Sequence, residues 1–246
     1  MQGLSYREYL ELFHHISLPT YTLHQIVSNE VALPPAFLPL EFFKDYLQRG
    51  YYPFRDKNYE SYLMQTVNAT IDVDIPQYAD LSIATTRKLK RLLAIIAMSA
   101  PFKPNFTQIG SQLGVSRNNV AYLCAWIERA GLIGQLRDST KGIQILGKVD
   151  KIYLDNPNLI YTVGSQDVEI GTVRETFFFN QVRTRYAITA SPVSDFLVDD
   201  TLTFEVGGKN KGQKQIKDTA NAYIVKDDIE TGYGNIIPLW MFGLIY

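Results

Sequence analysis

The chain has 246 residues, of which 46% are hydrophobic, and a formal net charge of -1. This length allows more than one hydrophobic core, and the near-zero charge excludes a generally basic nucleic-acid-binding protein, so any such contact must come from local patches. The single cysteine, Cys124, excludes a disulfide framework and indicates a reducing compartment. Without an apolar run that could span a membrane, or a recognisable signal peptide, we expect a cytoplasmic protein with no membrane partner.

Amphipathic helices are predicted along residues 1–80. The first covers 4–13, where Ser5 and Glu8 have the spacing of a capping box. Three further helices are expected at 21–29, 38–49 and 59–71, divided by the Pro34-Pro35 break and by the aromatic turn at 50–54. We interpret this part of the chain as a helical region.

Residues 81–148 predict a winged helix-turn-helix. A helix over 83–99 has a basic first half and an apolar second half, and we interpret it as the buried first helix of this domain. In the stretch 106–133, Gly114 ends one helix and Ser116 caps the next. Two short strand-like runs within 134–146 follow, joined by a polar turn, as in a wing.

In this kind of fold the first turn of the second helix contacts DNA. The candidate DNA-binding residues are those of that turn, one aromatic residue further along the helix, and a lysine of the predicted wing: Ser116, Arg117, Asn118, Asn119, Tyr122 and Lys141. However, Tyr122 and Trp126 lie one turn apart on the face expected to be exposed, which favours packing against a neighbouring protein domain. DNA binding and partner binding both remain open.

Residues 149–246 predict an α/β module. Two apolar, β-prone runs at 151–155 and 159–163 precede a helix over 171–182. Strand-like segments then follow at 186–190, 195–198 and 201–206, and the run at 223–225 and the apolar run at 236–245 complete the pattern. Interleaved helices and strands indicate a separate α/β or α+β domain.

Acidic residues stand where neighbouring strands begin and end in this module. Asp195 opens one predicted strand and Glu205 ends the next, so the pair are candidate ligands for Mg²⁺ or Mn²⁺. Glu175, in the preceding helix, is a third acidic candidate, and Lys209 is the candidate catalytic lysine. This order of acids with a downstream lysine is typical of PD-(D/E)XK nucleases.

The position of the lysine departs from the usual pattern. The pattern places lysine two residues after the second acid, on the same face of the strand, and Gly207 occupies that place here. In an extended strand Lys209 would lie roughly 13 Å from Glu205, at ~3.3 Å per residue, whereas a bulge at Gly207-Gly208 would bring it back. A nuclease-like fold without activity is the open alternative. The lysine-rich run at 209–217 is either a solvated loop or a rim that contacts phosphates.

The order of several segments resembles one family. These are GLSYREYL, the aromatic turn at 50–54, FKPN, GVSRNNV, KIYLDN, GTVRETFFFNQV, DFLVDD, FEVGGKNK and IPLWMFGLIY. Together they resemble the C-terminal region of prokaryotic AAA-type ATPases with an uncharacterised C-terminal domain. That resemblance implies a winged helix followed by a PD-(D/E)XK-nuclease-like domain, and FEVGGK looks like a recurrent variant in the family.

The chain lacks the GxxxxGK[ST] motif with which members of that family bind ATP, so we expect no ATP site and no ATPase activity. It resembles the non-ATPase half of such a protein. Our first hypothesis is an α+β regulatory module that binds DNA, an ATPase domain or another protein. The alternative is a Mg²⁺-dependent endonuclease acting on DNA through Glu175, Asp195, Glu205 and Lys209.

Overall fold

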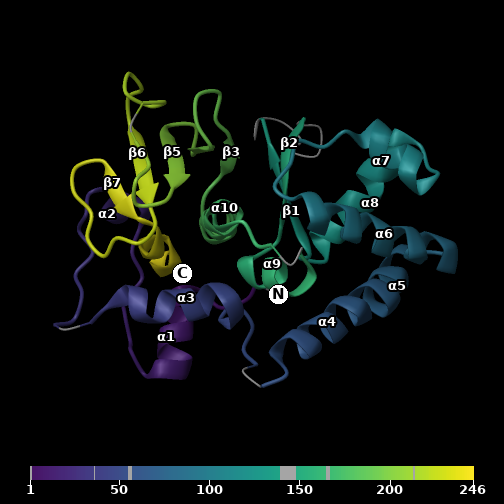
Figure 1. The fold of residues 1–246 in the computed structure, drawn as a ribbon, viewed down its shortest axis with the longest axis horizontal. Helices are drawn as coiled ribbons and strands as arrows, with labels where there is room; N and C mark the ends of the chain where they lie inside the picture. Colours follow the sequence, from purple (N-terminus) through teal and green to yellow (C-terminus); the bar gives the residue numbers. More distant parts are fainter. Residues whose placement is uncertain (1, 36, 55–56, 139–147, 165–166, 213) are drawn as a thin grey trace.

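The computed structural model describes residues 2–35, 37–54, 57–138, 148–164, 167–212 and 214–246. The fold is mixed α+β, with 48% helix and 14% strand. Helices form the N-terminal part and a five-stranded sheet forms the C-terminal part (Figure 1). The expected α+β class is therefore confirmed. Among the described residues, no helix has both the length and the apolar composition needed to cross a bilayer.

The N-terminal helices are α1 (Tyr6–His14), α2 (Leu23–Val27) and α3 (Pro39–Arg49). The predicted capping box of α1 is confirmed, because the Ser5 side chain accepts from the Glu8 amide and the Glu8 side chain accepts from the Ser5 amide. On its inner face α1 buries two tyrosine rings, Tyr6 and Tyr9, against Tyr46 of α3.

The last residues of the chain pack against this first helix. A 3₁₀-helix, η3 (Leu239–Leu244), contacts α1, α2 and α3. The Ser5 hydroxyl donates to the main-chain oxygen of Tyr246 at 2.7 Å, and Arg7 Nε donates to the same oxygen at 3.0 Å. The two ends of the chain therefore belong to one core, and both are near the lower centre of Figure 1.

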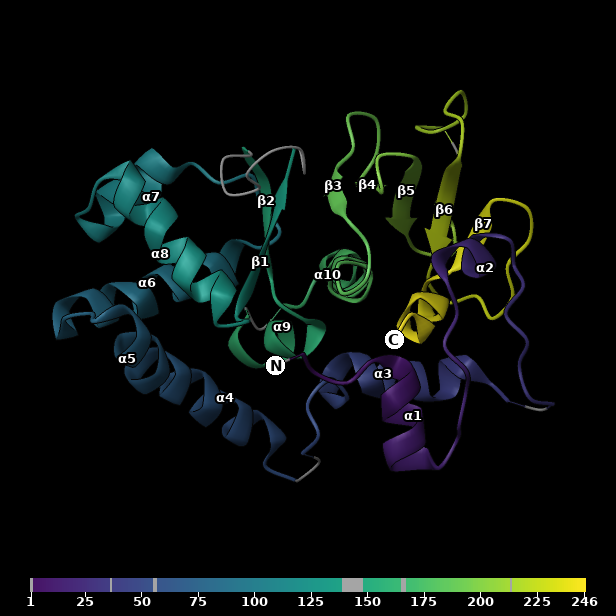
Figure 2. The same ribbon diagram turned by 180° about the vertical axis from the view of Figure 1, so that it is seen from behind.

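A rod of three consecutive helical segments follows: α4 (Tyr59–Ala69), the π-helix η1 (Thr70–Asp74) and α5 (Ile75–Ala79). The predicted helix over 59–71 is thus the first part of a longer one. The rod leads to α6 (Ile83–Ser99), which has the predicted bounds and begins at the N-cap Ser82. Figure 2 shows the rod extending away from α3 and reaching α6.

The central region contains α7 (Phe106–Leu113) and α8 (Arg117–Arg129), joined by a tight turn. Gly114 adopts a left-handed conformation with φ 63°, as predicted, and ends α7. Gly110 allows the turn to approach α7 closely, because a Cβ there would lie 2.7 Å from the Val115 carbonyl oxygen. A two-stranded antiparallel sheet follows, made of β1 (Ile133–Arg137) and β2 (Val149–Leu154).

The pairing of β2 with β1 crosses the boundary expected between residues 148 and 149. The sequence predicts the second strand of the wing within 134–146. The run at 151–155, which was expected to begin the C-terminal module, instead supplies most of β2 and pairs with β1. Residues 139–147, which include Lys141, lie outside the described part of the chain.

The run at 159–163 forms a helix, so the expectation of a strand there is wrong. This helix, α9 (Pro157–Val163), begins with Asn156 as N-cap and Pro157 in the first turn, two strong helix-start signals. Asn158 is fully buried and hydrogen-bonds α3: its amide donates to the carbonyls of Tyr46 and Leu47. An apolar run of five residues has too little periodicity to separate strand from helix.

The C-terminal sheet packs on α10 (Ile170–Val182). Its strands lie in sequence order: β3 (Ile188–Ala190), β4 (Phe196–Val198), β5 (Leu202–Gly207), β6 (Ala222–Lys226) and β7 (Ile236–Pro238). The pairs β3–β4 and β4–β5 are antiparallel, and β5–β6 and β6–β7 are parallel. Phe178 of α10 contacts Phe196, Phe204 and Phe242 with ring centroids 4.7–5.1 Å apart. In both views α10 lies between this sheet and the β1–β2 hairpin (Figures 1 and 2).

Candidate functional site

Three of the four predicted catalytic residues come together where the hairpin, α10 and the sheet meet. Lys151 of β2 links two of them, because its Nζ lies 3.1 Å from Glu175 Oε2 and 3.5 Å from Asp195 Oδ1. Asp195 Oδ2 also accepts from the backbone amide of Val206 at 2.9 Å, beside Glu205. The structure therefore joins Glu175, Asp195 and Glu205 into one acidic site.

Glu205 is the most deeply buried of the three acids, with 2% of its surface exposed. Its neighbour Phe204 packs on α10, so strand alternation directs the Glu205 side chain to the opposite face of β5. There it accepts a 2.6 Å hydrogen bond from the Ser194 hydroxyl and forms an ion pair with Lys211. A buried carboxylate needs such partners, since an unpaired charge in the interior is costly.

Burial raises the pKa of Asp195 above its ordinary value of 3.8, and the nearby negative charges of Glu175 and Glu205 raise it further. The Val206 amide and the Lys151 ammonium oppose this shift but do not cancel it. The folded protein therefore holds a proton on Asp195 more tightly than the unfolded chain does.

Lys151 and Tyr153 are neighbours on one face of β2, and both contact Glu175. Although burial lowers the pKa of Lys151, the two acids Glu175 and Asp195 outweigh it, and the net shift is upward. The Tyr153 hydroxyl donates to Glu175 Oε2 at 2.9 Å, and burial raises the pKa of this phenol far above its ordinary value. At neutral pH the site therefore contains a charged ammonium and an un-ionised phenol.

The fourth predicted residue, Lys209, is not where the sequence pattern placed it. Its side chain is exposed, and its carbonyl accepts a hydrogen bond from Lys226 Nζ at 3.1 Å. Gly207 pairs in register with Lys226, without the bulge that would bring Lys209 back. A turn follows the glycine pair, and the lysine that returns to Glu205 is Lys211. Lys211 takes the place expected for Lys209 because of the length of the turn, which the spacing of the motif does not specify.

The acids have the oxygen donors that Mg²⁺ and Mn²⁺ prefer, so the donor chemistry fits a divalent cation held by Asp195 and Glu205. Within the described ranges, no cluster of three or more His, Cys, Asp or Glu residues has a metal-binding arrangement. Instead, Lys151 pairs with Glu175 and Asp195, and Lys211 pairs with Glu205. A cation at this site would therefore compete with two internal ammonium groups.

The predicted DNA-binding residues of α8 lie on a free surface. Arg117, Asn118 and Asn119 are exposed, and the Asn119 amide donates to the hydroxyl of the N-cap Ser116. Tyr122 is 52% exposed and meets Trp126 edge-on, with ring centroids 5.8 Å apart. Trp126 is partly buried against the core, so only Tyr122 of this pair extends well into solvent. Lys141 lies outside the described residues.

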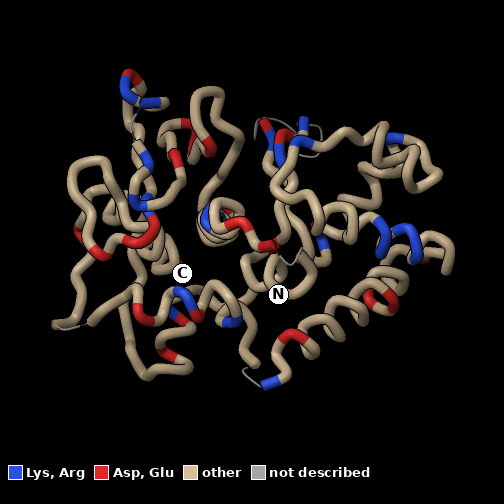
Figure 3. The backbone as a smooth tube through the Cα atoms, viewed as in Figure 1, with Lys and Arg blue, Asp and Glu red and all other residues tan. Residues whose placement is uncertain are grey.

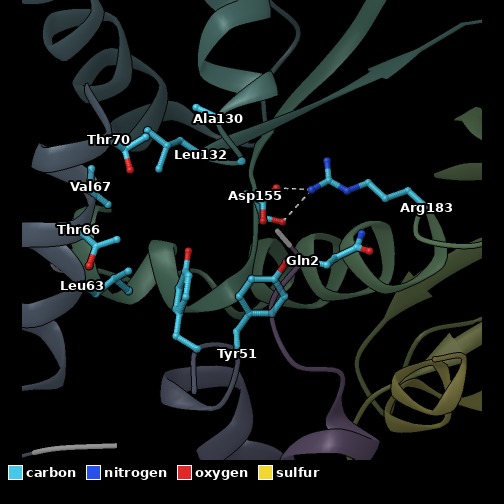
Figure 4. Close-up of a pocket in the computed structure, with 12 residues that line it drawn as sticks. Gln2, Tyr51, Leu63, Thr66, Val67, Thr70, Ala130, Leu132, Asp155 and Arg183 are labelled. Atoms are coloured by element: carbon cyan, nitrogen blue, oxygen red, sulfur yellow. Dashed lines mark hydrogen bonds and ion pairs between the residues drawn. The ribbon is translucent and has the colours of Figure 1, made fainter. Parts of the chain in front are cut away.

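A cavity of about 280 Å³ lies at the opposite ends of β2 and α10 (Figure 4). Its walls are the aromatic turn at 51–52, α4 and the turn between α8 and β1. At its base Asp155, 6% exposed, forms an ion pair with Arg183, and its carbonyl accepts from Asn180 at 2.9 Å. Asp155 is not among the predicted site residues, although a lone acid directly after a buried strand is a signal for such a site.

The structure thus defines an α+β protein with an acid–lysine site between its two sheets and an exposed polar helix face. The family model described as "Domain of unknown function (DUF8612)" matches residues 40–167, more than half of the chain, so the chain belongs to this family. The match includes α8 and the Lys151–Tyr153 segment, whereas Glu175, Asp195 and Glu205 follow it. Neither curated proteins nor solved structures gave a significant match.

Proposed function

We propose that the chain is a regulatory DNA-binding module that contacts duplex DNA through the first turn of α8. The observation that carries the proposal is the exposure of Arg117, Asn118 and Asn119 beside a capped helix N-terminus. Side chains of these types pair with base edges and phosphates in the major groove. We interpret α7, the tight turn, α8 and the β1–β2 hairpin as a winged helix-turn-helix.

The charge distribution predicts modest affinity. Lysine and arginine residues lie along α6 and on the hairpin near α7 and α8 (Figure 3). Two cations of this region are neutralised: Lys90 of α6 pairs with Asp72 at 2.6 Å, and Lys103, between α6 and α7, pairs with Asp150 at 3.1 Å. Few phosphate contacts are therefore available, and binding should be salt-sensitive and closer to non-specific than to operator-like affinity.

Fluorescence anisotropy with a labelled duplex tests this proposal. We expect the double variant Arg117→Ala, Asn118→Ala to lose about tenfold in affinity at low salt and to reduce the salt slope by about one. The matched control is Lys44→Ala, an exposed lysine on α3, far along the chain from α8. Equal binding by both variants and the wild type would show that α8 does not read DNA. Exposed Tyr122 would then mark this face as a surface for a protein partner, such as an ATPase domain.

The second candidate is a divalent-metal-dependent endonuclease, and the convergence of Glu175, Asp195 and Glu205 supports it. Asp195 and Glu205 would hold a Mg²⁺ or Mn²⁺ ion, which supplies an activated water and stabilises charge on the phosphate when bound. The chain's own residues orient the acids: Tyr153 fixes Glu175, and Ser194 fixes Glu205.

Plasmid cleavage in the presence of Mn²⁺ tests the second candidate. Asp195→Asn and Glu205→Gln should each abolish cleavage, because both residues would ligate the ion. Asp218→Asn, an exposed acid in the turn before β6, is the control and should cleave normally. A wild-type protein that leaves the plasmid intact would retire the nuclease candidate and leave DNA binding unaffected.

A further inference from the structure

Lys211 reaches Glu205 by crossing Gly207, the position at which the nuclease pattern expects a lysine. A Cβ on Gly207 would lie 2.7–2.8 Å from the Cβ, Cγ and Cδ atoms of Lys211. Gly207 is two residues from Glu205, so any side chain there would lie on the same face of β5. The aliphatic stem of Lys211 fills the space that the glycine leaves empty, and its ammonium meets Glu205 Oε1.

The turn that returns Lys211 is held by several independent contacts. The Lys211 amide donates to the Gly208 carbonyl at 2.9 Å, and the Asp227 amide donates to the Gly207 carbonyl at 2.9 Å. Below the turn, Arg174 of α10 pairs with Asp227 at 2.8 Å. A guanidinium nitrogen of Arg174 lies only 3.0 Å from where a Cβ on Gly208 would be. The turn is therefore a fixed part of the site.

We propose that Lys211 is the lysine that positions Glu205 in the acid site. It takes the place of the lysine that the nuclease pattern expects at position 207. Its ammonium fixes the Glu205 carboxylate, and it adds the positive charge that a phosphodiester substrate of nucleic acid requires beside three acids. Gly207 is the residue that makes this replacement possible. The inference deepens the endonuclease candidate and rests on it for the substrate, whereas the placement of Lys211 can be tested without catalysis.

A lysine-relocation experiment tests the proposal. Lys211→Met removes the ammonium, and Lys209→Met is the matched control, since Lys209 is an exposed lysine of the same turn. The double variant Gly207→Lys, Lys211→Gly moves the lysine to the strand position two residues after Glu205. Each variant is measured for melting temperature and for Mn²⁺-dependent plasmid cleavage.

We expect Lys211→Met to lower the melting temperature by about 5 °C, because it leaves a buried carboxylate unpaired, and to slow cleavage at least tenfold. Lys209→Met should change neither value. The relocated lysine should restore cleavage to within about threefold of the wild type. If Lys211 served only to hold the turn, a lysine at position 207 would not restore cleavage.

Two results would overturn the proposal: equal effects of Lys209→Met and Lys211→Met, or a folded relocation variant that recovers neither stability nor cleavage. If the wild type itself does not cleave DNA, the nuclease candidate fails. In that case the three melting temperatures still decide whether Lys211 holds Glu205, so the two failures remain distinguishable.

Discussion

The Lys151 ammonium lies 3.5 Å from Oδ1 of Asp195, although Lys151 is in the two-stranded sheet and Asp195 is beside the five-stranded one. Lys151 is on β2, which pairs with β1, and Asp195 directly precedes β4 of the five-stranded sheet. The hairpin that we assign to the proposed DNA-binding unit therefore contributes a cation to the acid site. Any displacement of β2 would move the Lys151 charge relative to the acid site. DNA binding and metal-dependent cleavage, the two proposed activities, are therefore physically connected.

The first prediction concerns competition between Lys151 and a metal ion. Lys151→Met leaves Glu175 and Asp195 without their shared ammonium, and we expect the free energy of unfolding to fall by about 1–3 kcal/mol in EDTA. Mn²⁺ should recover this loss, because a ligand that binds the folded state stabilises it. Thermal unfolding with EDTA and with Mn²⁺ measures both effects.

The control for this prediction is Lys148→Met, an exposed lysine just before β2, which should behave as the wild type. If Mn²⁺ stabilises the wild type as strongly as it stabilises the Lys151→Met variant, the Lys151 ammonium does not compete with the ion.

The second prediction concerns Asp195 and pH. Its pKa is raised in the folded state, so its contribution to stability is greatest at acid pH and decreases as the pH rises above 3.8. Asp195→Asn removes this titration and keeps an oxygen that can accept from the Val206 amide. The variant should therefore gain stability relative to the wild type between pH 4 and pH 7. Urea unfolding of both proteins across this range measures the difference in their free energies of unfolding. If this difference becomes smaller towards pH 7, the pKa of Asp195 is not raised in the folded protein.

The third prediction compares two helical glycines. Gly110→Ala should destabilise the protein by about 1–3 kcal/mol, because the new Cβ would lie 2.7 Å from the Val115 carbonyl oxygen. Gly171→Ala, in the first turn of α10, is the control: among the described residues no atom lies within 4 Å of its Cβ position, so alanine should stabilise the helix by about 0.5 kcal/mol. Chemical denaturation measures the change in free energy of unfolding for each variant. Changes of opposite sign would support the tight α7–α8 turn, and changes of the same sign would argue against it.

The fourth prediction concerns Cys124, which is buried in α8. Burial, with a smaller effect of Glu128, raises the pKa of this thiol to about 12. Because the thiolate is the reactive form, the native protein should not react with a thiol reagent at pH 8, whereas the unfolded chain should react at once. The chain has a single cysteine, so stopped-flow labelling during unfolding reports one site. Rapid labelling of the native protein would show that α8 opens readily.

Local sequence signals located most of the helices, because caps and apolar spacing act within one or two turns. Ser5 with Glu8 gave the start of α1, and the bounds of α6 matched those expected. Leu159–Val163 has the apolar composition of a strand, but the Asn156 cap and Pro157 start a helix there. A short apolar run of four or five residues is compatible with either a strand or a helix.

The acid site was harder to predict than the fold. Asp195 and Glu205 could be proposed from neighbouring strands, but Lys151 reaches Asp195 through the β1–β2 register, which has no local signal. Lys211 reaches Glu205 through a turn whose direction depends on contacts with Arg174 and Asp227. Both lysines were therefore missed because long-range packing places them.

The hydrogen bond between Ser5 and the carbonyl of Tyr246 has a consequence for the order of folding. The tyrosine-rich face of α1 is completed by η3, and the two hydrogen-bonded residues are 241 positions apart in the sequence. Closing so long a loop costs entropy before the contact stabilises anything, so α1 should be covered late in folding. In pulsed hydrogen exchange during refolding, the amides of α1 should therefore become protected after those of α7 and α8, which are neighbours in the sequence.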